Sequence, residues 1–137
     1  MKYVILIPIY NDRESLKMLI ENINIELKDL NHEVSIVVIN DASSQQIIDT
    51  YTNIENISSF EIISMRENRG HARCIASGLK YIFEKKEFDF VIPMDGDGED
   101  RPEEIVSFLD KIKKSQDKPI VGESVKRSEN KIFKICY

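Results

Sequence analysis

The sequence has few cysteines, and their placement excludes several kinds of site. Its 137 residues contain two, Cys74 and Cys136, which lie far apart and outside any Cys-x-x-Cys or Cys/His cluster. This spacing indicates neither a disulfide framework nor a thiolate metal site. A reducing, cytoplasmic compartment fits this usage, and Cys74 is expected to be a small packing residue rather than a nucleophile.

Long apolar runs are also missing. No stretch reaches the roughly 18 apolar residues that a transmembrane helix needs. The apolar run at residues 2–9 meets Pro8 and Asn11 too early for a signal peptide, and we interpret it as a buried strand. Any membrane contact is therefore expected to be peripheral, at the inner membrane face.

Basic residues are outnumbered, which argues against binding to nucleic acid. The chain has 19 Lys and Arg against 24 Asp and Glu, a net charge of -5, whereas nucleic-acid binders depend on neutralising phosphates. Hydrophobic residues at 42% and charged residues at 31% are typical of a globular protein. The length predicts one domain over residues 1–137.

The common phosphate-binding motifs are absent as well. Neither Gly-Lys-Ser/Thr nor Gly-x-Gly-x-x-Gly occurs, so ATP hydrolysis and NAD chemistry are disfavoured. A calcium loop of the EF-hand type starting at Asp95 would need Gly at position 100 and Glu at position 106, which are Asp and Val here. This type of calcium site is therefore excluded.

Strand and helix patterns alternate along the chain. Val- and Ile-rich runs predict buried strands, and apolar residues at steps of three and four predict amphipathic helices. The expected strands cover 2–9, 34–39, 60–64, 88–94 and 119–122, and the expected helices cover 16–30, 45–51, 72–83 and 102–114. This alternation predicts an α/β fold with a mostly parallel sheet and ligands at the carboxyl ends of its strands.

The sharpest chemical signal is the pair Asp95 and Asp97, separated by Gly96 directly after the fourth strand. Two carboxylates at this spacing can face one hard cation, Mg²⁺ or Mn²⁺, and the neighbouring glycines are expected to leave room for a ligand. An acidic turn is the alternative, with Asp100 as the N-cap of the next helix. That alternative leaves the repulsion between Asp95 and Asp97 without an offsetting partner.

Polar residues also follow the first three strands. Asp41 could accept hydrogen bonds from a ribose or a base, although a turn Asp is an adequate account. After the first strand, Tyr10 could pack on a base and Asp12 could accept from it, or Asp12 could cap the helix. Arg69 and Arg73, beside the turn at residues 68–71, could attract phosphate, or this segment is an ordinary polar loop.

Four segments in order resemble family 2 glycosyltransferases, nearest to the polyprenyl-phosphate sugar transferases of the dolichol-phosphate mannose synthase type. They are Pro8-Ile-Tyr-Asn-Asp12, Val38-Ile-Asn-Asp41-Ala-Ser43, Asn68-Arg-Gly70 followed by Gly78, and Asp95-Gly-Asp97-Gly-Glu99-Asp100-Arg-Pro102-Glu103. The resemblance covers residues 3–122. It implies a GT-A fold, a Rossmann-like arrangement of three layers with the sheet between helices.

The resemblance also implies a reaction and roles for named residues. A sugar would pass, with inversion, from a UDP- or GDP-sugar donor to an acceptor such as polyprenyl phosphate or a cell-surface glycan. Mn²⁺ or Mg²⁺ would neutralise charge on the departing nucleotide. Asp95, Asp97 and Glu99 would hold the metal, with Asp97 catalytic. The expected nucleotide contacts are Pro8, Tyr10, Asp12, Asp41, Asn68, Gly70 and Asp95.

Some features depart from the family pattern. Asn40-Asp41-Ala42-Ser43 stands where relatives have Asp-Asp-Gly-Ser, and Gly122-Glu123-Ser124 lacks a usual Arg. Family members continue further, so the chain is expected to be the N-terminal part of a longer catalytic domain.

Two alternatives to the enzyme stay open. The first is a noncatalytic nucleotide-sugar-binding or interaction fragment, whose apolar end at residues 132–137 would pair with a second copy or another chain. The second, a sugar-phosphate nucleotidyltransferase, is disfavoured because the first strand lacks a glycine-rich basic loop after it.

Overall fold

The computed structural model describes residues 1–47, 51 and 54–114. Within these residues, four parallel strands form one sheet in the order β3-β2-β1-β4. The strands are β1 (Lys2–Ile9), β2 (Glu33–Asn40), β3 (Ser59–Ser64) and β4 (Phe90–Pro93), and the helices are α1 (Arg13–Glu26), α2 (His71–Lys85) and α3 (Glu103–Lys114). The predicted α/β class and parallel sheet are confirmed.

The chain divides into two compact units, residues 1–107 and 108–137, with the boundary inside α3. The sheet, α1 and α2 belong to the first unit, and the following description concerns that unit. The prediction of a single domain over residues 1–137 stays a prediction. No helix among the described residues is long and apolar enough to cross a membrane.

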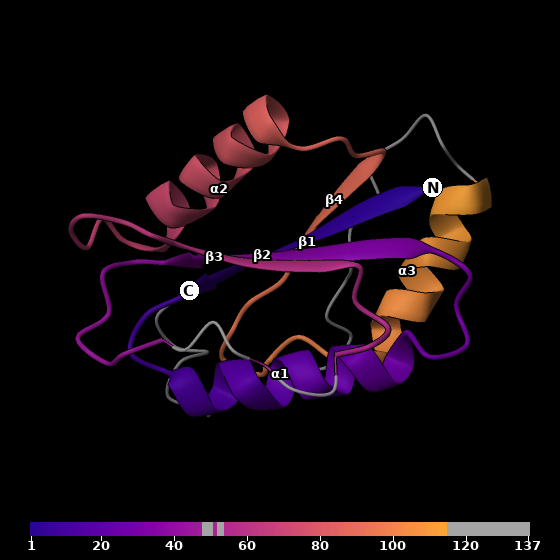
Figure 1. Ribbon diagram of the computed structural model, residues 1–137, viewed down its shortest axis with the longest axis horizontal. Coiled ribbons are helices and arrows are strands. Elements are labelled where there is room, and N and C mark those ends of the chain that lie inside the picture. Colours follow the sequence, from indigo (N-terminus) through magenta and orange to yellow (C-terminus); the bar gives the residue numbers. More distant parts are fainter. Residues whose placement is uncertain (48–50, 52–53, 115–137) are drawn as a thin grey trace, which may run out of the picture. The chain divides into compact units, whose positions relative to one another are not determined.

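Helices cover both faces of the sheet, α1 on one and α2 on the other (Figure 1). Seven of the eight residues of β1 are buried, because side chains of a strand alternate between the two faces and both are covered here. Val4 and Leu6 pack with Cys74 and Ile82 on the side of α2. Each fully buried Leu or Ile contributes about 2 kcal/mol to the stability of the fold. Because nearly all of β1 is buried, this strand is the centre of the core.

Gly78 allows α2 to approach the sheet closely. A Cβ at this position would lie 2.8 Å from Cγ1 of Ile39 and would also clash with Leu6. The residue therefore has a packing role, which agrees with its place on the buried side of the helix beside Cys74 and Ile82.

Helix α1 begins and ends earlier than predicted. The Oδ1 atom of Asp12 accepts a hydrogen bond from the backbone N–H of Ser15 at 3.2 Å, which makes Asp12 the N-cap. The helix ends at Glu26, and the N–H groups of Lys28 and Leu30 then bond three residues back. Such bonds tighten the chain into turns, so the helix does not continue to Leu30.

The predicted helix over residues 45–51 is wrong for its described part. Residues 45–47 and 51 are not helical. The Oδ1 atom of Asn11 accepts from the backbone N–H groups of Ser44 and Gln45 at 2.8 and 3.3 Å, which ties this segment to the end of β1 instead.

The predicted strand over 88–94 is shorter, Phe90–Pro93, although Asp89 and Met94 still donate backbone hydrogen bonds to β1. The predicted strand over 119–122, the apolar run 132–137 and Cys136 lie outside the described residues.

Candidate functional site

The order of the strands identifies one edge of the sheet as the place for a site. From β1 the chain moves outward to β2 and β3, then returns to place β4 on the other side of β1. The connections on either side of β1 therefore diverge, α1 to one face and α2 to the other (Figure 1). In open α/β sheets, ligands bind in the crevice beyond the carboxyl ends of such strands.

A cleft of about 240 Å³ lies at this point, beyond the ends of β1 and β4. Its lining comes from three segments that are far apart in the sequence. They supply Pro8, Ile9, Tyr10 and Asp12 after β1, His71 at the start of α2, and Asp95, Gly96 and Asp97 after β4. The structure thus brings together five residues predicted for the site: Pro8, Tyr10, Asp12, Asp95 and Asp97.

The electrostatics of the cleft favour a cation. Burial raises the pKa of Asp95, and the charges of Asp100 and Asp97 raise it further, while His71 lowers it. The Nε2 atom of His71 lies 3.4 Å from Oδ1 of Asp95. A raised pKa means that the negative charge on Asp95 is disfavoured where it stands, and a bound cation would relieve this cost.

Local hydrogen bonds shape the loop after β4. The backbone N–H of Asp95 donates to Oδ2 of Asp100 at 2.7 Å, and that of Glu99 donates to Oδ1 of Asp97 at 3.0 Å. Gly98, with φ of 85°, takes a conformation that favours glycine. Helix α3 begins at Glu103, three residues after Asp100, and the Asp100 carboxylate closes the loop onto Asp95 instead of capping the helix.

The structure gives Gly96 a packing role that the sequence did not predict. A Cβ at this position would lie 2.8 Å from the carbonyl oxygen of Pro8 and 3.2 Å from Cγ2 of Ile7. Gly96 therefore leaves room for the end of β1, and it lines the cleft as well. Its effect is to let the loop with the two aspartates lie against the end of the strand that precedes Tyr10 and Asp12.

Asp41 lies at the end of β2 but does not line the cleft. It is 3% exposed, and its Oδ1 and Oδ2 atoms accept from the backbone N–H groups of Arg69 and Gly70, both at 2.8 Å. The carboxylate thus holds the loop that leads into α2. Both of its oxygens have backbone partners. The predicted contact of Asp41 with a nucleoside stays a prediction.

The loop before α2 contains two more predicted contacts. Gly70 has φ of 84°, a backbone conformation that favours glycine. Neither Gly70 nor Asn68 lines the cleft, and their contacts with a nucleotide also stay predictions. His71, the next residue, does line it, although the sequence pattern indicated no role for this residue. Its place directly after the turn was the only available signal.

Only two of the three predicted metal ligands, Asp95 and Asp97, line the cleft. Among the residues that the structure describes, no three His, Cys, Asp or Glu side chains gather into a set that could hold a metal ion. Glu99 is thus not assembled with Asp95 and Asp97. Two carboxylates beside an open cleft still fit Mg²⁺ or Mn²⁺, which commonly take one or two carboxylates and fill the remaining positions with water and phosphate oxygens.

Comparison with known proteins identifies the family. The family model described as Glycosyl transferase family 2 matches residues 4–134 of this chain. The chain belongs to this family.

Curated relatives share this family and carry more specific names. One is an undecaprenyl-phosphate 4-deoxy-4-formamido-L-arabinose transferase of Yersinia enterocolitica, 29% identical over 97% of this chain and 39% of the relative. A protein of the same name from Pseudomonas savastanoi is 35% identical over 74% of this chain and 29% of the relative. The chain therefore spans about two fifths or less of these relatives.

Solved structures support the fold. Residues 1–349 of TarS from S. aureus, crystallised with UDP-GlcNAc, match with a TM-score of 0.65 at 21% identity, over 93% of this chain and 38% of that one. At this level of identity the likeness shows the fold alone. The predicted GT-A architecture is confirmed.

Proposed function

We propose that this chain binds a UDP- or GDP-sugar in the cleft between β1 and β4 and supplies the donor side of a metal-dependent sugar transfer. The observation that carries the proposal is the convergence of Tyr10 and Asp12 with Asp95 and Asp97 on one cleft at the switch point of the sheet. An aromatic ring and an acceptor lie on one wall, and paired carboxylates on the other.

Each wall suits one part of the donor. Tyr10 is 53% exposed, so its ring is available to pack on a base. Asp12 is fixed at the cleft by its cap on α1. Asp95 and Asp97 would hold the cation, and Glu99 would have to move toward them to become a further ligand. The bound metal would neutralise charge on the departing nucleotide diphosphate.

Asp41 and Gly70 act on the donor through the loop. The two hydrogen bonds from Arg69 and Gly70 to Asp41 fix the backbone that ends in His71 at the cleft. Preorganisation of this kind lowers the cost of ordering a site when its ligand arrives. We place Asn68 and Pro8 with them as residues that shape the nucleotide site.

The acceptor proposed for the full enzyme is a polyprenyl phosphate, because the curated relatives are named as undecaprenyl-phosphate transferases. This function places the chain at a membrane surface. A transfer assay with labelled donor and undecaprenyl phosphate tests it. Nucleotide binding without transfer would support the noncatalytic alternative.

Calorimetry tests donor binding directly. UDP and GDP are titrated into the chain with Mn²⁺ and then with EDTA, for the wild type, Asp97→Asn and the control Asp29→Asn, which removes an exposed acid far along the chain. We expect one nucleotide to bind only with Mn²⁺, roughly tenfold or more weakly in Asp97→Asn, and unchanged in the control. A folded chain that binds neither nucleotide would contradict the proposal.

A further inference from the structure

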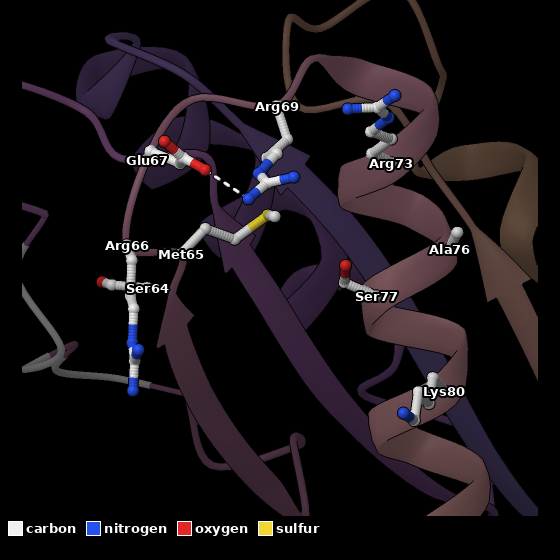
Figure 2. Close-up of a pocket in the computed structure, with 9 residues that line it drawn as sticks. All are labelled: Ser64, Met65, Arg66, Glu67, Arg69, Arg73, Ala76, Ser77 and Lys80. Atoms are coloured by element: carbon white, nitrogen blue, oxygen red, sulfur yellow. Dashed lines mark ion pairs between the residues drawn. The ribbon is translucent and has the colours of Figure 1, made fainter.

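A second hollow lies on the other side of the loop between β3 and α2. Its volume is about 870 Å³, and it is lined by the end of β3, by the loop and by one side of α2. We call it the basic groove, because its lining includes Arg66, Arg69, Arg73 and Lys80 (Figure 2). Arg69 lines the basic groove while His71, two residues later, lines the cleft.

One face of α2 forms a wall of the basic groove. Arg73, Ala76, Ser77 and Lys80 all line it (Figure 2). Their spacing of three, four and seven residues places them on one face of a helix. Two cations about 10 Å apart along the axis thus flank two small side chains, which leaves open space between the charges.

The charge of the basic groove opposes that of the whole chain. Its lining has four cationic side chains and one acid, Glu67, whereas the chain has a net charge of -5. Arg69 pairs with Glu67, and Lys80 lies 3.8 Å from Glu84. Within the part of the chain that the structure describes, Arg66 and Arg73 have no acidic side chain within ion-pairing distance.

The loop and the helix that carry the cations of the basic groove are fixed by contacts that leave the charged groups themselves available. The backbone of Arg69 is fixed by Asp41, so its guanidinium is presented from an anchored loop. Cys74 and Ile82, on the buried side of α2, pack in the core and fix the helix. Cations displayed from two rigid elements lose less conformational freedom when they bind an anion.

We propose that the basic groove binds a phosphate-bearing ligand at a site separate from the donor cleft. One guanidinium group can donate two parallel hydrogen bonds to two oxygens of a phosphate. Four cations around one concave surface favour a ligand with more than one negative charge. The phosphate can belong to a lipid headgroup at a membrane surface or to a soluble molecule. The site needs no metal, in contrast to the proposed donor cleft.

The test uses the whole chain in EDTA with two probes. Inorganic pyrophosphate, titrated in a calorimeter, represents a soluble phosphate. Vesicles of equal parts phosphatidylglycerol and phosphatidylcholine, compared with phosphatidylcholine alone in a sedimentation assay, represent a lipid surface. We expect the wild type to bind at least one probe, and the probe that binds identifies the source of the phosphate.

Two matched variants assign the binding to the basic groove. Arg66→Glu with Arg73→Glu should weaken it about tenfold or more. Lys17→Glu with Lys28→Glu makes the same change in charge on exposed residues in and after α1 and should leave binding nearly unchanged. Should the first pair unfold the chain, Arg66→Gln with Arg73→Gln gives the same comparison without charge reversal.

The proposal is overturned when neither probe binds, when the groove variant binds like the wild type, or when the control pair weakens binding equally. Equal weakening by the control pair would show that the probe is attracted by the total charge of the chain and not by the basic groove. Asp97→Asn separates this proposal from donor binding, because it should weaken metal-dependent nucleotide binding roughly tenfold or more and leave phosphate binding in EDTA intact.

Discussion

Asp41 and Asp95 follow strands that lie on either side of β1 in the same sheet, yet their surroundings differ. Asp41, after β2, is 3% exposed and accepts two hydrogen bonds from backbone N–H groups. The side chain of Asp95, after β4, is 48% exposed and stands near Asp97 and Asp100, which raise its pKa in addition to burial. The carboxylate of Asp41 has two backbone donors, whereas that of Asp95 stands near two like charges and the imidazole of His71.

This difference separates a structural aspartate from one available to a ligand. A buried carboxylate with two N–H donors stabilises the loop that it holds. A partly exposed carboxylate beside two others carries an electrostatic cost, which His71 offsets in part and a bound cation would offset further. In sequence, both are simply aspartates at the end of a buried strand.

The largest effect on stability is expected for Asp41→Ala. It leaves the N–H groups of Arg69 and Gly70 without their acceptor, and hydrogen bonds to a charged group are worth about 2 kcal/mol each. We expect a loss of roughly 2–4 kcal/mol in the free energy of unfolding, measured by urea denaturation. Asp41→Asn, which keeps one oxygen, should lose less. A loss below about 0.5 kcal/mol in the free energy of unfolding of Asp41→Ala would contradict the structural role given to Asp41.

Gly96→Ala should have the next largest effect. Its Cβ would press on Pro8 and Ile9, and overpacking of this kind costs about 1–3 kcal/mol. Gly98→Ala is the matched control, because a Cβ there would meet nothing within 4 Å and the cost arises only from its φ of +85°. Thermal unfolding compares the two. Equal losses, with nucleotide binding retained in Gly96→Ala, would contradict the packing role.

Asp95→Asn should affect nucleotide binding and leave stability nearly unchanged, in contrast to Asp41→Ala. The pKa of Asp95 is raised in the folded chain, so its ionisation costs stability as the pH rises above the ordinary Asp value of about 4. We expect Asp95→Asn to match or slightly exceed the wild type in stability at pH 7 and to lose Mn²⁺-dependent nucleotide binding. Denaturation at pH 4 and pH 7 should show the difference shrinking at the lower pH. A clear loss of stability at pH 7 would assign Asp95 a structural role like that of Asp41.

The smallest effect concerns Cys74, which reports on the loop held by Asp41. Burial, and then the charge of Asp41, raise the pKa of its thiol to about 11. In a Cys136→Ser background, iodoacetamide should modify Cys74 slowly at pH 8, because the thiolate is the reactive form. Adding Asp41→Ala should speed the reaction by opening the loop. Rapid modification without that change would contradict the buried setting.

The sequence predicted the strands and the parallel sheet because their patterns are local. Unbroken apolar runs such as 2–9 can be buried only between two layers, which the structure confirms. The helix expected over 45–51 failed because the Asn11 side chain holds Ser44 and Gln45, a contact across more than thirty residues. Periodicity carries no information about such contacts.

The site was predictable in part. Placement after strands predicted the convergence of Tyr10, Asp12 and Asp95, since parallel strands end at one edge. The partners of Asp41 and the approach of His71 depend on how the loop before α2 folds back. The basic groove was also missed as a surface, because it joins a helix face to a loop that only the fold places side by side.

Paramagnetic broadening by Mn²⁺ tests the central claim most directly. In amide NMR spectra recorded with UDP or GDP, small amounts of Mn²⁺ should broaden signals of Tyr10, Gly96 and Asp97 first. The end of α1 near Glu26, far along the helix from its cap at Asp12, should stay sharp, and Mg²⁺ should cause no broadening. Asp95→Asn combined with Asp97→Asn should abolish the effect. Broadening centred elsewhere, or unchanged in that variant, would contradict the assignment of Asp95 and Asp97 to the metal of a nucleotide-sugar site.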